Sequence, residues 1–180
     1  DNKNNVYLIT KVESNHHNNS SVRTSRMKIE IRHAEPEDAE ALQAIHADEA
    51  LYADTLQLPM PSKTLWRKRL ADIPDNMHFL VAEIEGELVG CLGLETMVSK
   101  RRRHVASFGV SVKTASQGKG VGRALITAAL DLADNWLATR RIEITTYTDN
   151  TGAIGLYKSL GFVIEGEMVD YAYRNGEYVN

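Results

Sequence analysis

Residues 110–124 read VSVKTASQGKGVGRA and join two strong secondary-structure patterns. Before this stretch, Val105–Val112 is rich in β-branched and apolar residues, which predicts a strand. After it, apolar residues recur at helical spacing at Val121, Leu125, Ala128, Leu132 and Trp136. Between the two patterns, glycines at 118, 120 and 122 let the backbone take positive φ and approach a bound group closely. The stretch therefore predicts a strand, a glycine loop and a long helix.

The glycine loop has the chemistry of a phosphate or pyrophosphate site. The first amides of the following helix lack intrahelical partners and carry partial positive charge, and Lys119 and Arg123 add formal charge. The Walker spacing does not occur, and the pattern G-x-G-x-x-G fails because Arg123 stands where its third glycine would be. The pattern that fits is Q-x-x-G-x-G, at Gln117, Gly120 and Gly122. A helix start that needs only a tight turn is the alternative interpretation.

Composition limits the class of protein. The chain has 180 residues, of which 43% are hydrophobic and 25% charged, as expected for one globular domain. The single cysteine, Cys91, excludes a disulfide framework and a cysteine-based zinc cluster. A net charge of −3 provides no basic field for nucleic acid or anionic membranes, and no apolar run reaches the length of about 18 residues that a membrane span needs. We therefore expect a soluble cytoplasmic domain without a metal, a nucleic-acid partner or a membrane anchor.

The remaining patterns predict a mixed α/β order, with antiparallel hairpins first and strand–helix–strand crossovers later. Strands are expected at Lys28–Arg32, at Phe79–Ile84 and Leu88–Glu95 around a turn at 85–87, at Arg141–Tyr147 and at Phe162–Tyr173; helices are expected from Pro36, after Ser62 and over Asn150–Leu160.

The two ends of the chain differ in their predictions. Residues 1–26 are rich in Asn and Ser, so they are expected to be a polar extension outside the core, with the folded domain spanning 27–180. At the other end, Asn175-Gly176 predicts a hairpin turn. Only residues 177–180 follow it, so the return strand is expected to be short.

A second motif follows the glycine loop at a later helix. Asn150, Ala153, Leu156, Tyr157, Gly161 and Phe162 fit N-x-x-A-x-x-L-Y-x-x-x-G-F. With the [QR]-x-x-G-x-[GA] pattern at 117–122, this motif makes residues 28–180 resemble the GNAT superfamily of acetyl-coenzyme A-dependent N-acetyltransferases. The stretches 32–34, 70–72, 134–137 and 174–179 also look like the bacterial YhhY-type amino-acid N-acetyltransferases.

The resemblance implies a GNAT fold. This is a mixed central β-sheet with antiparallel N-terminal strands, splayed central parallel strands at Val105–Val112 and Arg141–Tyr147, and flanking helices. It also implies a final strand beyond Asn180, acetyl-CoA as co-substrate, a small amine acceptor such as an amino acid, and a chain able to form a homodimer. Two other functions stay open: acetylation of a protein or peptide amine, and a non-catalytic CoA-binding sensor.

The resemblance also implies roles for individual residues. The residues expected to bind the cofactor are Val110, Ser111, Val112, Gln117, Gly118, Lys119, Gly120, Val121, Gly122, Arg123, Asn150 and Tyr157. Tyr157 is expected to protonate the leaving thiolate, and His104 or Glu95 to deprotonate the amine. Tyr52, Asp54 and Glu95 are expected on the acceptor side.

Each role has a structural alternative. Tyr157 fits a core aromatic, Asn150 a plain helix N-cap and His104 a surface imidazole. An acceptor carboxylate would suit an arginine from the run 101–103, although such a run is usually a solvated loop.

Overall fold

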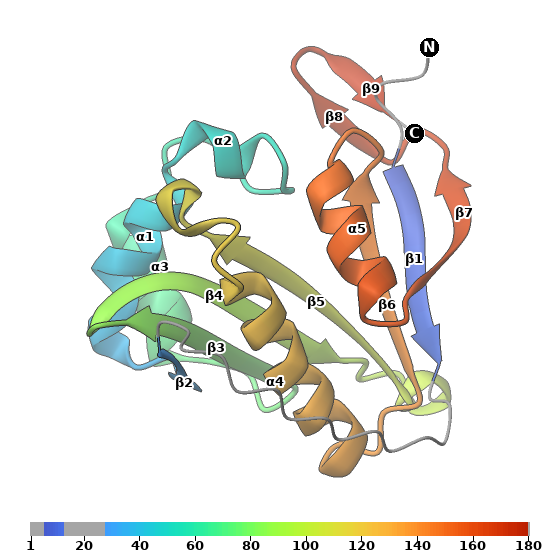
Figure 1. Ribbon diagram of the computed structural model, residues 1–180, viewed down its shortest axis with the longest axis horizontal. Coiled ribbons are helices and arrows are strands. Elements are labelled where there is room, and N and C mark those ends of the chain that lie inside the picture. The colour runs from blue at the N-terminus through green and yellow to red at the C-terminus, as the bar shows by residue number, and fades with distance from the viewer. Residues whose placement is uncertain (1–5, 13–27, 180) are drawn as a thin grey trace.

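The computed structural model describes residues 6–12 and 28–179 (Figure 1). Its strands are β1 (Val6–Val12), β2 (Ile29–His33), β3 (Met77–Ile84), β4 (Glu87–Thr96), β5 (Val105–Val112), β6 (Arg141–Tyr147), β7 (Val163–Met168), β8 (Ala172–Arg174) and β9 (Glu177–Val179). Its α-helices are α1 (Ala39–His46), α2 (Glu49–Tyr52), α3 (Lys63–Ala71), α4 (Val121–Asn135) and α5 (Thr151–Ser159), with 3-10 turns at Pro36–Asp38, Lys100–Arg102 and Thr114–Ser116.

A mixed sheet of seven strands forms the centre, in the order β2-β3-β4-β5-β6-β1-β7. Its pairs are antiparallel except for β5 with β6, which run parallel as expected. The strands β8 and β9 form a separate hairpin beside α5 and β6 (Figure 1). Within the described ranges, none of the helices has the length and apolar character needed to cross a membrane.

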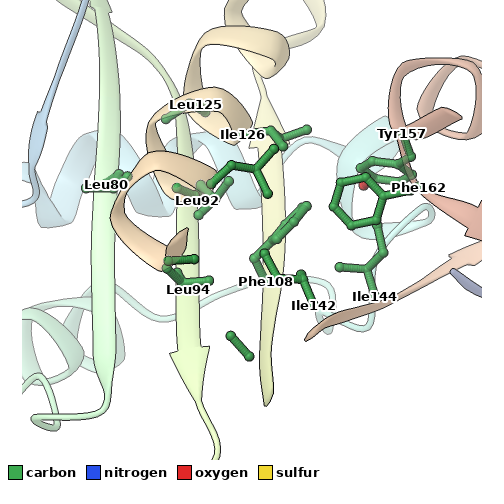
Figure 2. Packing of buried hydrophobic residues seen from close by; sticks show 14 of the residues in the cluster. Leu80, Leu92, Leu94, Phe108, Leu125, Ile126, Ile142, Ile144, Tyr157 and Phe162 are labelled. Carbon is green, nitrogen blue, oxygen red and sulfur yellow. The ribbon is translucent and has the colours of Figure 1, made fainter. Parts of the chain in front are cut away.

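Helices cover both faces of the sheet. Leu80 and Leu92 pack against α4, whereas the alternate residues Val81 and Cys91 pack against α1 and α3, as the period of two along a strand requires. Figure 2 shows Phe108 of β5 near Tyr157 and Phe162, with ring centres about 6 Å away. Two layers of helix on one sheet thus bury a core on each face.

Most of the local predictions are confirmed, and two are wrong. Phe162–Tyr173 is not one strand, because the chain turns at Asp170, whose φ is 48°, and β8 then begins a separate sheet. Trp136 does not continue the buried face of α4. It follows the last residue of the helix and is 77% exposed.

Strand β1 contradicts the expectation for the start of the chain. Val6–Val12 lies between β6 and β7 and pairs with both, and Val6 and Ile9 are fully buried. The prediction that residues 1–26 stay outside the core is therefore wrong for Val6–Val12, while residues 1–5 and 13–26 lie outside the described residues. Burial between two strands outweighs the polar composition of the surrounding sequence.

An ion pair also spans β1. Arg141 of β6 reaches across to Glu165 of β7, with its Nη1 2.8 Å from the carboxylate, and its Nε is 2.7 Å from Glu143. The hydrogen bond from Arg141 is the main cause that lowers the pKa of Glu165 to about 2. The two strands that flank β1 are thus linked by side chains as well as by β1 itself.

The contribution of β1 to the core is testable. Ile9→Ala should lower the free energy of unfolding by about 2–5 kcal/mol, because truncating a fully buried side chain leaves a cavity. Val12→Ala on the same strand is the matched control, because Val12 is 58% exposed. It should change stability by less than about 0.5 kcal/mol. Urea unfolding measures both; an Ile9→Ala midpoint equal to that of the wild type would place β1 outside the core.

Candidate active site

The site begins where the central parallel strands separate. β5 and β6 pair only at Val105–Arg141, Ala106–Ile142 and Ser107–Glu143. Beyond Ser107, β5 keeps its pairing with β4, and β6 keeps its pairing with β1 as far as Tyr147. A gap therefore opens between two strands that are each held on their outer side.

The register of β5 shows which backbone groups face this gap. The O of Val105 accepts from the N–H of Met97 and the N–H of Lys113 donates to Val89, so both residues direct their backbone toward β4. The register between β4 and β5 is unbroken, and the direction alternates along an antiparallel strand. Val110 and Val112 therefore direct their N–H and C=O groups toward the gap. A strand-like ligand arm can pair with them there.

A cavity of about 1230 Å³ includes this gap. It extends from the glycine loop at one end to α3, β3 and β4 at the other. Gly93 and Gly109, which are opposite each other in the β4–β5 register, line its floor without side chains. The volume of this cavity is large enough for two substrates.

The glycine loop has the geometry of an anion site. Gly118 and Gly120 have φ of 73° and 91°, and Gly120 is the N-cap of α4. A side chain at Gly122 would come within 3.3 Å of Leu156, so the loop lies close to α5. Arg123 lines the same end of the cavity and donates to the Oγ of Ser159 at 2.7 Å. The loop thus combines amides at a helix N-terminus with a formal positive charge.

Tyr157 lies on α5 and lines the cavity near the gap. It is only 7% exposed, and burial raises the pKa of its phenol to about 12. Its ring packs against Phe108 and Phe162, as the core-aromatic interpretation predicts. A phenol held in this way stays protonated at neutral pH and can donate a proton into the cavity.

Asn150 caps a helix, as one of its two interpretations predicts, and it also lies at the cavity. Its Oδ1 accepts from the N–H of Ala153 at 3.1 Å, which caps α5, and the residue lines the cavity. Gln117 donates to the O of Val112 at 3.3 Å, which ties the end of β5 to the glycine loop.

A cluster of charged side chains lies beside the cavity where Asp54 and Tyr147 line it. Arg174 lies over the ring of Tyr147, with its guanidinium carbon 4.2 Å from the ring centre. It pairs with Asp149, and its Nη1 is 3.9 Å from Asp54. Burial and the charge of Asp149 raise the pKa of Asp54, and Arg174 opposes them. The cluster joins the loop after α2 to the β8–β9 hairpin.

Most of the predicted site residues meet at this cavity. Those that line it are Val110, Ser111, Val112, Gln117, Gly118, Gly120, Val121, Gly122, Arg123, Asn150, Tyr157, Asp54 and Glu95. Glu95 lies opposite Ser107 where the gap begins, and accepts a long hydrogen bond of 3.4 Å from Asn76.

The structure does not bring the other predicted residues to the cavity wall. His104 is exposed just before β5, at the end of the strand away from the gap, so it matches the surface interpretation. Tyr52 and Lys119 are not among the lining residues. In the basic run, Arg102 pairs with Glu143 and Arg103 lines a separate hollow beside Asn76.

Several residues of the cavity wall were not predicted from the sequence, among them Trp66, Arg69 and His46. His46 is buried, and burial lowers the pKa of its imidazole. Its Nδ1 donates to the O of Leu42 at 2.8 Å, which leaves Nε2 facing Cys91 Sγ at 4.0 Å. The packing of α1 against β4 brings His46 to the cavity.

Burial raises the pKa of the Cys91 thiol to about 12, so Cys91 acts as a small core residue. Across the described ranges, no group of three or more His, Cys, Asp or Glu side chains is arranged to hold a metal ion.

Comparison with known proteins agrees with this geometry. The acetyltransferase (GNAT) family matches residues 40–162. The L-amino acid N-acetyltransferase AaaT of Escherichia coli K12 is 47% identical over 153 residues, which cover 85% of this chain and 94% of that protein.

Solved structures share the fold. A GNAT-family acetyltransferase from Streptococcus pneumoniae superposes with a TM-score of 0.72 at 28% identity, covering 84% of this chain and 95% of that one. A phosphinothricin acetyltransferase from Sinorhizobium meliloti, solved with AcCoA, gives a TM-score of 0.73 at 21% identity over 85% of this chain and 84% of that one. With the splayed sheet and glycine loop described above, these matches place the chain in the GNAT family of acetyltransferases.

Proposed function

We propose that this protein transfers an acetyl group from acetyl-CoA to the α-amine of an L-amino acid, by direct attack while both substrates are bound. The observation that carries the proposal is the single cavity that joins the glycine loop, the gap beside Val110 and Tyr157. The 47% identical relative is an L-amino acid N-acetyltransferase, which supports the choice of acceptor, and the AcCoA complex of a structural neighbour supports the co-substrate.

The cofactor half of the cavity fits a long anionic thioester. The glycine loop, the first turn of α4 and Arg123 would hold a pyrophosphate, and the backbone groups of Val110 and Val112 would pair with the pantetheine arm. Lys119, outside the lining residues, would add only long-range attraction. When bound, acetyl-CoA supplies the activated acyl group.

Two residues at the gap, Val110 and Tyr157, would take part in the acetyl transfer. The N–H of Val110 points into the gap and would stabilise the negative charge that develops on the thioester oxygen. Tyr157 would give its proton to the departing sulfur, whose thiol form has a pKa of about 8.5. A phenol with a pKa near 12 remains in the acid form throughout the pH range in which amines acetylate.

The acceptor amine must be neutral when it attacks. A peptide α-amine has a pKa near 8. The α-amine of a free amino acid is more basic because of the carboxylate beside it, so a base that removes its proton would assist the attack at neutral pH. Glu95 is our candidate base because it lines the cavity beside the start of the gap, whereas His104 does not. Asp54 provides a second carboxylate for attracting the ammonium form.

The direct test measures thiol release from acetyl-CoA with free L-amino acids, short peptides, polyamines and aminoglycosides as acceptors. We expect kcat/KM to be highest for free amino acids. Higher values for peptides would replace the proposal with protein N-terminal acetylation. If no acceptor turns over while coenzyme A still raises the melting temperature, the chain is a sensor and the enzymatic proposal fails.

The role of Tyr157 is tested by Tyr157→Phe. This change removes the acid and keeps the ring, so kcat should fall by about 100-fold while the Kd for coenzyme A stays within about twofold. Tyr173→Phe is the matched control, because Tyr173 is exposed on the β8–β9 hairpin.

The pH profile provides a second measurement of this role. Because the pKa of Tyr157 is about 12, the wild-type rate should rise as the amine loses its proton and should not decline below about pH 10. Full activity of Tyr157→Phe would remove Tyr157 from the mechanism.

A further inference from the structure

The positive charges on the cavity wall are few. Among the described residues that line it, Arg69 and Arg123 are the arginines, and no lysine joins them. Arg123 lies at the glycine-loop end, where it donates to Ser159. Arg69 comes from α3, on the side of the cavity formed by β3 and β4. The acceptor side therefore has its own arginine, distinct from the one beside the glycine loop.

An aromatic cluster supports the guanidinium of Arg69. Its carbon lies 5.2 Å from the ring centre of Trp66, which is one helical turn earlier and only 3% exposed. Trp66 is fixed in turn by the rings of His46 and Phe79, at 4.4 and 6.1 Å between centres. A guanidinium on a rigid aromatic face loses little freedom when it binds a ligand.

The hydrogen-bond donors of Arg69 are not used by a protein carboxylate. In the described part of the chain, no Asp or Glu oxygen lies within 4.0 Å of its nitrogens. By contrast, Arg67 two residues earlier pairs with Glu40, and Arg174 pairs with Asp149. Arg69 thus lines the cavity with a planar fork that matches two carboxylate oxygens.

The acceptor side also carries negative charge. Asp54 and Glu95 line the same cavity from the loop after α2 and from β4. A wall with separate acidic and basic groups complements a zwitterion, whose ammonium and carboxylate have opposite signs. A polyamine offers no group to the arginine and is repelled by it.

We propose that Arg69 binds the α-carboxylate of the acceptor and thereby selects amino acids over amines that lack a carboxylate. This inference rests on the proposed function and identifies a residue that determines its specificity. Residues of the run 101–103, the other source of an arginine for this role, do not line the cavity.

The experiment compares each amino acid with its α-amide, which keeps the side chain and amine but has no carboxylate. For each acceptor, kcat/KM is measured for the wild type and for Arg69→Gln, and the value for the variant is divided by the value for the wild type. This ratio cancels the different basicity of the amines. For the amino acids this ratio should lie about 10- to 100-fold below 1, mainly because KM rises, as expected for the loss of a charge-assisted bond. The ratio for the amides should stay within about twofold.

Two further variants separate recognition from general damage. Arg67→Gln, on the same helix, removes a surface ion pair with Glu40 and should leave both ratios unchanged. Arg69→Lys keeps the charge without the fork and should recover part of the loss. The Kd for coenzyme A should be the same in all variants, since Arg69 lies away from the glycine loop.

Two results would overturn the inference. Equal ratios for amino acids and amides with Arg69→Gln, whether both fall or neither does, would mean that Arg69 does not recognise the carboxylate. If the wild-type enzyme prefers amides or polyamines to amino acids, the proposed acceptor class fails and the inference fails with it. The wild-type panel alone distinguishes this second failure from the first.

Discussion

The parallel pairing between β5 and β6 stops after three residue pairs, and the site depends on this interruption. If the two strands paired to their ends, the backbone groups of Val110 and Val112 would bond to β6 and the sheet would be closed. Because the strands separate, these groups face a gap, and side chains from both faces of the sheet reach one cavity. The proposed binding surface is thus made largely of main chain that β6 leaves unpaired, and of these groups the O of Val112 accepts from Gln117.

An open gap in a sheet has a structural cost, which neighbouring strands offset. β5 is held along its whole length by β4, and β6 is held from Arg141 to Tyr147 by β1. The ion pair between Arg141 of β6 and Glu165 of β7 also helps to hold β6 in place, since it reaches across β1. The two halves of the sheet are therefore each stable up to the edge of the gap. The Tyr157 ring also supports this arrangement, because it packs against Phe108 of β5 and against Phe162, which follows α5.

Local patterns in the sequence were sufficient to predict the elements that would hold the cofactor. Val105–Val112 and Arg141–Tyr147 were predicted with the observed bounds, and Gly120 and Gly161 have the positive φ that glycine permits. These features depend on residues close together in the chain. The family motifs added the proposed role of Tyr157 as a proton donor, because burial alone would have assigned this residue to the core.

The predictions that failed depend on contacts between distant residues. Strand β1 has only a short apolar stretch, and its partners lie at least 129 positions later, at β6 and β7. His104 lies next to β5, as expected, but at the end of the strand that is away from the gap. Arg69 has no motif; the position of α3 over β3 and β4 gives it its place beside the cavity. The acceptor half is therefore assembled by tertiary packing, and its residues could not be identified from spacing.

The central claim is that the thioester arm pairs with β5 in the gap, and amide hydrogen exchange measured by NMR tests it most directly. Gly109 and Ser111 direct their backbone toward β4, so their amides should exchange slowly with or without coenzyme A. Val110 and Val112 face the gap, so their amides should exchange quickly in the free protein and become protected with saturating acetyl-CoA. Unchanged exchange at Val110 and Val112, with protection appearing elsewhere, would contradict the account.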